Sequence, residues 1–247
     1  MAHLYIADDL ASTSVGASIA LRGQEARHAA GVSRLRVGES ILITNGRGLS
    51  LECVATSVAK DTVELVVESV TEVALQQPVI TLVQALAKGD RDERAIEMAT
   101  ELGVSAVIPW QAARSVSRWE GEKAVKGRDR WQAIVREASK QSVRAWIPQV
   151  APVASTSQLV AACATELTLV LDTSGTKSLS DVATMTSVSQ AQAFRIIVGP
   201  EGGLAPEEIA ALAGAGAHIV GLGSNILRTS TAGPSALAVL NELLTRW

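Results

Sequence analysis

The chain has 247 residues and a mass of 25.8 kDa, with 47% hydrophobic and 19% charged residues. This composition predicts a folded protein of one large or two smaller domains and excludes a disordered tail or a collagen-like chain. Cys53 and Cys163 stand far apart and in no Cys-x-x-Cys pair, so neither a disulfide framework nor a cysteine metal site is expected. The N-terminus lacks a signal-peptide pattern and no run of about 18 apolar residues occurs, which favours a cytoplasmic protein without a membrane segment.

The formal net charge is −3, but the basic residues are concentrated in the middle of the chain. Residues 1–72 contain 6 basic and 9 acidic side chains, residues 88–146 contain 12 and 9, and residues 147–247 contain 4 and 7. Basic groups interleaved with aromatic rings are typical of RNA-binding surfaces, and a solvated helical face with core tryptophans is the alternative. Four of the five tryptophans lie in this region: Trp110, Trp119, Trp131 and Trp146.

Residues 1–72 are predicted to form a small, mostly β domain. Residues 3–7 predict a strand and residues 23–35 a short helix. The β-branched runs ESILITN, LSLECVATSV and TVELVVESV predict strands joined by hairpins, a pattern typical of a small barrel. Residues 73–87 then contain no charged side chain, and the apolar run PVITLVQAL predicts a strand buried on both faces. A second domain is therefore expected over residues 73–247.

Strands and helices alternate through this second domain. Asp90 is expected to cap a helix that Gly103 ends, further helices are expected over residues 131–141 and from Pro206, and a last helix near Pro234. Alternation of this kind predicts a parallel sheet with helices on both sides, and ligands bind beyond the carboxyl ends of such strands. The loops at residues 199–205 and 222–230 are therefore the expected location of the chemistry. The strands after the first are expected at residues 104–109, 167–171, 194–198 and 218–221.

The first of these loops lies in the segment IIVGPEGGLAPEEI, residues 196–209. Three glycines between a strand and a helix allow close approach of the backbone to a ligand, although the glycines by themselves favour a tight structural turn. The pattern matches neither of the two common glycine-rich phosphate-binding motifs.

The second loop lies in GLGSNILRTSTAGPSALAVL, residues 221–240. Ile226 and Leu227 are apolar in a loop expected to be exposed, so they indicate something that they cover. Arg228 can hold a phosphate, a carboxylate or a developing oxyanion, whereas Thr229 and the hydroxyls after it are expected to cap the last helix.

VGPEGG followed by LGSNILRTSTAGPSAL resembles the C-terminal signatures of the SPOUT methyltransferases, an α/β fold whose C-terminal segment is tucked into a trefoil knot. Upstream, KGDRDERAIEMATELGVSAVIPWQAARSVSRW and RWQAIVREASKQSVRAWIPQV resemble the branch that methylates uridine N3 in 16S ribosomal RNA. RHAAGVSRLRVGESILITNGRG resembles the PUA-like RNA-binding domain of that branch. The four segments span nearly the whole chain in order, which makes the resemblance far more specific than either glycine loop.

The resemblance implies S-adenosyl-L-methionine as methyl donor, no metal, a homodimer, and 16S ribosomal RNA within the assembled small subunit as substrate. Arg228 is the candidate for stabilising negative charge on the reacting base, and Glu201 is the nearest candidate carboxylate, with ordering of its loop as the alternative. Trp119 or Trp146 is a candidate for stacking on a base, and the last helix offers Leu237, Leu240 and Leu244 to a dimer. The implied donor-binding residues are Leu171, Gly199, Pro200, Glu201, Gly202, Leu222, Gly223, Ile226 and Leu227, and the expected RNA contacts are Arg34, Arg36, Arg114, Arg118 and Arg144.

The sequence departs from the pattern of this branch at three places. Ser230 replaces a common Glu, Val143 replaces the Gly of a common Ser-Gly-Arg motif, and Met98 replaces a common Lys. The missing Glu argues against a carboxylate base at residue 230. Two other functions stay open: a SPOUT ribose 2′-O-methyltransferase acting on tRNA or ribosomal RNA, and a non-catalytic RNA-binding assembly factor.

Overall fold

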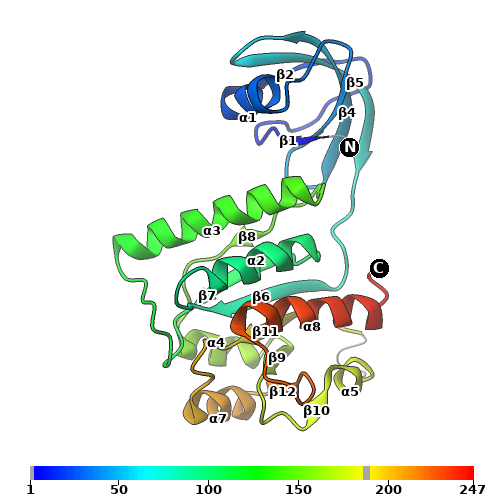
Figure 1. Ribbon diagram of the computed structural model, residues 1–247. Coiled ribbons are helices and arrows are strands. Elements are labelled where there is room, and N and C mark those ends of the chain that lie inside the picture. The colour runs from blue at the N-terminus through cyan, green and yellow to red at the C-terminus, as the bar shows by residue number, and fades with distance from the viewer. Residues whose placement is uncertain (1–2, 186–189) are drawn as a thin grey trace. The chain divides into compact units, whose positions relative to one another are not determined.

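The computed structural model describes residues 3–185 and 190–247, and the chain divides into two compact units (Figure 1). The first contains the residues up to Leu75 together with the segment Ser139–Ile147, and the second contains Gln76–Ala138 and Pro148–Trp247. The segment Ser139–Ile147, which the sequence placed in the second domain, packs with the first. The Thr44 hydroxyl donates to the carbonyl of Ala145 at 3.1 Å, and the Trp146 indole donates to that of Val73 at 2.7 Å. Such contacts join residues far apart in the chain, so local composition does not reveal them.

The first unit is built on a five-stranded sheet with β1 and β2 at its edges. β1 is parallel to β3, and the other neighbouring pairs are antiparallel. Side chains alternate between buried and exposed along β4, so residues such as Leu51 and Cys53 form the core of this unit. The sequence predicted every element except β2. In the order of the sheet the strands are β1 (Leu4–Ile6), β3 (Ser40–Thr44), β4 (Leu49–Val58), β5 (Thr62–Glu72) and β2 (Ser18–Arg22), with the helices α1 (Gly23–Arg27) and η1 (His28–Val32).

The second unit contains a seven-stranded sheet in which all described pairs are parallel, as predicted. β11 lies at its centre with residues 196–198 buried, so the loop after this strand opens at the carboxyl edge of the sheet. The order of the strands is β10 (Lys177–Ser178), β12 (His218–Gly221), β9 (Thr168–Leu171), β11 (Ala193–Val198), β6 (Val79–Ala85), β7 (Ala106–Trp110) and β8 (Gln149–Val150). The predicted trefoil knot stays a prediction.

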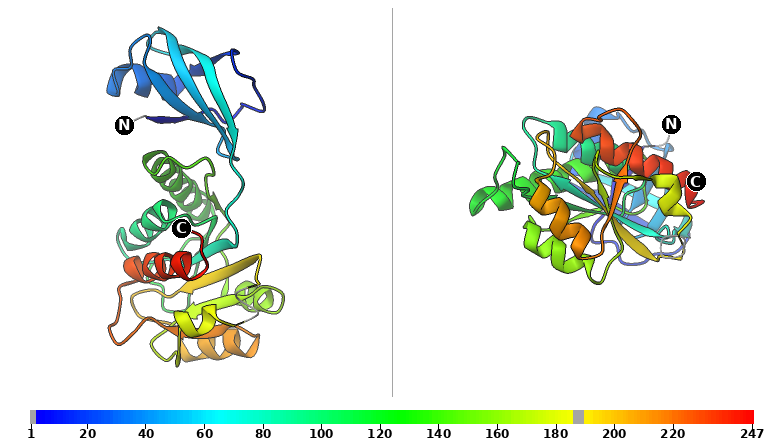
Figure 2. Two further views of the ribbon diagram at one scale, coloured as in Figure 1. Left: turned by 90° about the vertical axis from the view of Figure 1, so that its right-hand side faces the viewer. Right: turned by 90° about the horizontal axis from the view of Figure 1, so that it is seen from below.

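Helices cover both faces of this sheet (Figure 2). On one face lie α2 (Arg91–Glu101) and α8 (Thr229–Leu243), which contact each other, with α5 (Leu179–Ala183) against α8. On the other lie α4 (Thr156–Cys163) and α7 (Pro206–Gly214). The helix α3 (Glu122–Gln141) pairs with α2 through Arg130 and Glu93, 2.7 Å apart. Among the described helices, none is long and apolar enough to cross a membrane.

Two predicted helix starts and one predicted cap differ from the structure. The helix expected over residues 131–141 already begins at Glu122. The last helix begins at Thr229, not near Pro234, which lies inside it, because the backbone N–H groups of Thr231 and Ala232 already bond to the carbonyl of Arg228. Asp90 stands at the N-cap of α2, but its side chain makes no capping bond and pairs instead with Arg94 at 2.9 Å. The Asp90 carboxylate thus pairs with the guanidinium of Arg94, four residues later in the chain, and not with a backbone N–H group.

Candidate active site

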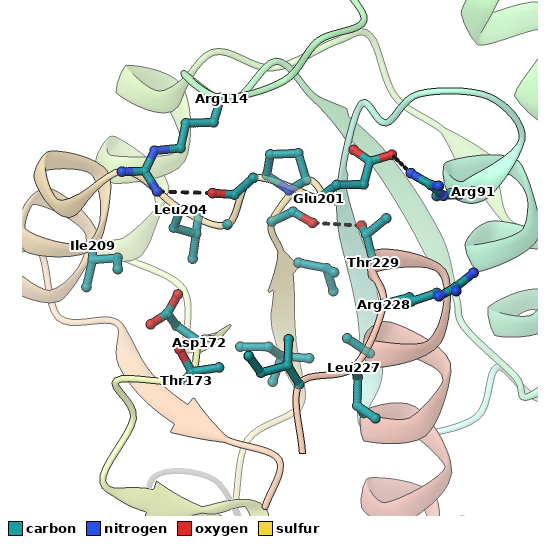
Figure 3. A pocket seen from close by; sticks show the side chains of 18 residues that line it. Arg91, Arg114, Asp172, Thr173, Glu201, Leu204, Ile209, Leu227, Arg228 and Thr229 are labelled. Carbon is teal, nitrogen blue, oxygen red and sulfur yellow. Dashed lines mark hydrogen bonds and ion pairs between the residues drawn. The ribbon is translucent and has the colours of Figure 1, made fainter. Parts of the chain in front are cut away.

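A cavity of about 680 Å³ opens beyond the carboxyl ends of β9 and β11 and beside the start of α8 (Figure 3). Its volume is within the range of sites that bind small ligands, roughly 300–1,000 Å³. Both loops that the sequence singled out contribute to it. The lining residues are Arg91, Arg114, Leu171, Asp172, Thr173, residues 198–204, Ile209, residues 226–229 and Ala232.

The glycine loop, residues 199–203, is held by side chains from three separate elements. The Thr229 hydroxyl, at the start of α8, donates to the carbonyl of Gly199 at 2.7 Å. The Arg114 guanidinium, from the segment after β7, donates to the carbonyl of Gly202 at 3.0 Å. Arg91, the first residue of α2, pairs with the Glu201 carboxylate at 2.8 Å (Figure 3). These contacts fix the loop before any ligand arrives, which lowers the cost of binding.

Glu201 serves mainly as the acceptor that ties this loop to the start of α2. Its Oε1 also accepts a hydrogen bond from the backbone N–H of Lys88 at 2.9 Å. Burial raises the pKa of Glu201, but hydrogen bonds from its own backbone N–H, from Arg91 and from Lys88 outweigh burial and lower this pKa below its ordinary value of 4.5. A carboxylate with a lowered pKa is a poor proton acceptor near neutral pH. The geometry therefore favours the loop-ordering role for Glu201 over the catalytic one.

A buried chain of hydrogen bonds connects the sheet to the start of α8. Gln84, which is fully buried on β6, donates from Nε2 to the Thr229 hydroxyl at 2.8 Å, and this hydroxyl donates onward to Gly199. Thr229 was expected to cap the last helix, but it joins the two loops instead. Gln84 was not predicted, because its role depends on β6 lying beside β11, which no local motif encodes.

Arg228 lines the cavity with an exposed side chain. Within residues 3–185 and 190–247, its guanidinium has no hydrogen-bond or ion-pair partner, in contrast to Arg91 and Arg114. Figure 3 shows its side chain at the start of α8, on the opposite side of the cavity from Asp172, with the guanidinium directed away from the middle of the cavity. The guanidinium is therefore available to an incoming group.

Seven of the nine implied donor-binding residues line the cavity: Leu171, Gly199, Pro200, Glu201, Gly202, Ile226 and Leu227. Ile226 is 85% exposed, as expected for an apolar side chain at the rim of a ligand site. Leu222 and Gly223 are not among the lining residues, since the chain turns there at the end of β12, with φ of +87° at Gly223. The lining residue Asp172 was not predicted. Its position directly after a buried strand was the signal that could have found it.

The five predicted RNA contacts divide between the two units. Arg34 and Arg36 are exposed in the loop between η1 and β3, and Arg144 lies in the segment Ser139–Ile147 of the same unit. Arg118 is exposed in the second unit, but Arg114 binds the glycine loop. The role of these residues toward RNA stays a prediction.

The tryptophans of the basic segment have contacts within the protein. Trp131 is buried, and the ring of Trp119 meets it edge-on with centroids 5.1 Å apart. Trp146 anchors its segment to Val73. Stacking of Trp119 or Trp146 on a base stays a prediction.

No group of three His, Cys, Asp or Glu side chains suited to a metal occurs among the described residues, and the absence of a metal from the reaction also stays a prediction.

Comparison with known proteins identifies the family of both units. Residues 74–241 match the model of the RNA methyltransferase domain. The chain belongs to this family. Residues 21–68 match the model of the RNA methyltransferase PUA domain, which agrees with the predicted RNA-binding domain. The predicted α/β fold class and the prediction of an RNA methyltransferase are confirmed.

Relatives of this family match the chain over nearly its whole length. It is 42% identical to the ribosomal RNA small subunit methyltransferase E of Mycobacterium bovis, covering 100% of this chain and 94% of the relative. The protein of the same name from Bacillus subtilis is 34% identical, covering 91% and 90%.

Two solved structures of methyltransferases are also similar to the chain. One, from Legionella pneumophila in complex with the bound cofactor SAM, has 30% identity and a TM-score of 0.86. The other is a ribosomal RNA small subunit methyltransferase E from Neisseria gonorrhoeae bound to S-adenosyl methionine, with 29% identity and a TM-score of 0.85. Each comparison covers 98% of both chains.

Proposed function

We propose that this protein transfers a methyl group from S-adenosyl-L-methionine to N3 of a uridine in the 16S RNA of the small ribosomal subunit. The observation that carries the proposal is the cavity built by both signature loops, in a chain 42% identical over its full length to a protein named for ribosomal RNA small subunit methylation. A protein with this substrate acts in the cytoplasm, where ribosomal subunits are found.

The residues around the cavity fit this donor. Leu171, Ile226 and Leu227 offer apolar surface to the adenine ring, and the backbone of the glycine loop offers polar groups at close range. A side chain at Gly199 would place its Cβ 3.2 Å from Leu204 Cγ, so the loop is packed too tightly to accept one without a shift. The bound donor supplies the methyl group together with its own leaving group.

Methylation first removes the proton from N3, which leaves negative charge shared over the ring carbonyls. The carbon–nitrogen bond then forms as the bond between the methyl carbon and sulfur breaks, and the sulfur leaves as a neutral thioether. Arg228 is the candidate to stabilise this charge, because it lines the cavity and its guanidinium has no partner among the described residues. Glu201 holds the glycine loop in place, so its effect on rate is indirect. The target uridine must be unpaired when it reacts, since N3 lies on its pairing edge.

The proposal includes a homodimer formed through α8. Of the residues predicted for this contact, Leu237 and Leu240 are buried in the protein's own core and are not available. Apolar residues exposed at or just after the end of this helix are Val239 at 43%, Leu243 at 42% and Trp247 at 64%. Val239 and Leu243 are four residues apart in α8 and so share one side of it, whereas Trp247 follows the end of the helix. This side of α8 is the proposed dimer face.

The test is methylation of small ribosomal subunits isolated from cells in which the gene is deleted. After incubation with the protein and S-adenosyl-L-methionine, the RNA is digested to nucleosides and analysed by chromatography and mass spectrometry. We expect 3-methyluridine, whose added mass stays on the base when the glycosidic bond breaks. The 2′-O-methyl isomer would instead lose that mass with the ribose, and its appearance would favour the ribose methyltransferase.

A non-catalytic assembly factor is the remaining alternative. Calorimetry with S-adenosyl-L-methionine separates it from an enzyme, because an assembly factor without a donor site has no reason to bind the donor. Absence of binding at millimolar donor, together with normal binding to the subunit, would support the assembly factor.

A further inference from the structure

Asp172 follows β9 directly and presents its carboxylate to the cavity from the side opposite Arg91 and Arg228 (Figure 3). Its backbone N–H donates to the carbonyl of Val220 at 3.1 Å, which fixes the residue at the edge of the sheet. One carboxylate oxygen, Oδ1, accepts hydrogen bonds from the backbone N–H of Ser174 at 2.8 Å and from its hydroxyl at 2.7 Å. The other oxygen, Oδ2, has no partner in the part of the chain that the structure describes.

The charges around the cavity distinguish the Asp172 carboxylate from the other charged groups that line it. Three arginines line the cavity, and the only other lining carboxylate, Glu201, is already paired with Arg91. The surroundings thus carry a surplus of positive charge, which suits RNA but opposes a positively charged small molecule. Among the described lining residues, Asp172 is the one carboxylate without a cation partner.

The methyl donor and its product differ in charge. S-adenosyl-L-methionine carries a sulfonium in addition to its ammonium and carboxylate groups, so its net charge is positive. The product, S-adenosyl-L-homocysteine, has a neutral thioether in place of the sulfonium. A carboxylate facing the sulfur therefore attracts the donor more strongly than the product.

We infer that Asp172 is the residue that makes the cavity discriminate between the charged donor and its neutral product. Its negative charge attracts the sulfonium and so offsets the repulsion between the sulfonium and the surrounding arginines. This attraction disappears when the methyl group leaves, because the sulfur is then neutral. The product is then held more weakly than the donor, which favours exchange of one for the other after each turnover. This inference rests on the proposed function, because it takes the donor of that proposal as the ligand.

The test compares three ligands by calorimetry in the wild type and in Asp172→Asn. The ligands are S-adenosyl-L-methionine, S-adenosyl-L-homocysteine and sinefungin, an analogue with a protonated amine in place of the sulfonium. The amide retains an oxygen that can accept from Ser174, so the negative charge is removed while this hydrogen bond is kept. We expect the donor and sinefungin to lose about tenfold in affinity, which corresponds to the loss of one moderately screened charge contact, and the product less than about twofold.

The controls separate this role from a structural one. Ser174→Ala removes one hydrogen bond to Asp172 but keeps the charge, so it should shift the three affinities equally. Asp172→Glu restores the charge and should recover part of the preference for the donor. Equal loss for all three ligands in Asp172→Asn would mean that Asp172 contacts a shared part such as the ribose, and no loss would mean that it contacts none of them; either result overturns the inference. A wild type that binds none of the ligands would instead contradict the proposed function.

Discussion

Three arginines line the cavity, and their partners separate them into two kinds. Arg91 and Arg114 are bound to the glycine loop, through the Glu201 carboxylate and the Gly202 carbonyl. Arg228 has no such contact among the described residues, although it stands next to the buried Thr229, which fixes its backbone. Arginines of the first kind shape the site, whereas an arginine of the second kind can act on a substrate.

Arg228→Ala should lower the single-turnover rate of methylation about 100-fold while the affinity for RNA is nearly kept, because a contact made mainly in the transition state appears in the rate. The matched contrast is the double variant Arg34→Ala/Arg36→Ala, whose side chains are exposed on the other unit. This variant should weaken RNA binding, reduce the salt dependence by about one counterion per lost phosphate contact, and leave turnover at saturating RNA unchanged. Rapid-quench kinetics and binding at several salt concentrations measure both effects. A normal rate in Arg228→Ala with weakened RNA binding would place Arg228 among the phosphate contacts.

Glu201 should make the stability of the protein depend on acid pH. Because its pKa is lowered in the folded state, its contribution to the free energy of unfolding is complete above its ordinary pKa of 4.5 and is lost as the pH falls through the folded value. The unfolding midpoint of Glu201→Gln should therefore lie below that of the wild type by a constant amount above pH about 5, and the difference should shrink in more acidic solution. Thermal unfolding from pH 7 to pH 3.5 measures this difference. A difference that grows on acidification would contradict the lowered pKa.

At the scale of the elements, the glycine loop depends on where four separate segments end or begin. The loop follows β11, and its partners come from α2, from the segment after β7 and from the start of α8. Only the parallel arrangement of β6, β7 and β11 brings these segments to one edge. A change in the loop is therefore expected to disturb ligand binding more than folding, because the strands beneath it are buried and independently paired.

Gly202→Val should reduce donor affinity by more than about tenfold, since the branched side chain stands at the cavity wall and crowds Arg114. The first carbon of the new side chain would lie 3.4 Å from Arg114 Cβ, which is an ordinary contact, so the fold should survive. Gly214→Val is the matched control, because nothing lies within 4 Å of a Cβ at that position in α7. Calorimetry together with circular dichroism checks both variants. Wild-type affinity in a folded Gly202→Val would refute close approach of the loop to the donor.

On the scale of the whole molecule, apolar side chains are exposed at and just after the end of α8, at Val239, Leu243 and Trp247, and Arg228 stands at the opposite end of this helix. A dimer formed there would be continuous with the helix that carries a candidate catalytic residue. Since most soluble oligomers are symmetric, the same face on a second copy is the expected partner of this surface.

The double variant Val239→Glu/Leu243→Glu should therefore convert the dimer into a monomer. Light scattering at micromolar concentration is expected to give twice 25.8 kDa for the wild type and 25.8 kDa for the variant. Val32→Glu is the matched control, since Val32 is an exposed valine of the other unit, and it should leave the dimer intact. A wild type that is monomeric and fully active would show that the dimer is not required.

The sequence by itself determined most of the strands, the parallel sheet and the two loops that line the cavity, but it did not predict β2, β8, β10, α4 or α5. The predicted features depend on local chemistry: alternating β-branched residues predict strands, glycines allow tight loops, and an apolar pair such as Ile226 and Leu227 in a polar loop indicates a ligand. For the same reason Arg228 was found, because it lies within one of these loops.

Only the tertiary structure decided which side chains are engaged and which are free. In the structure, Arg114 donates to the carbonyl of Gly202, and Glu201 pairs with Arg91. Leu237 and Leu240 are buried. The segment Ser139–Ile147 belongs to the first unit. The tertiary structure also added Asp172 and Gln84 to the site. The physical reason is that hydrogen bonds and burial depend on distance in space, and residues far apart in the chain become neighbours only when the strands pair.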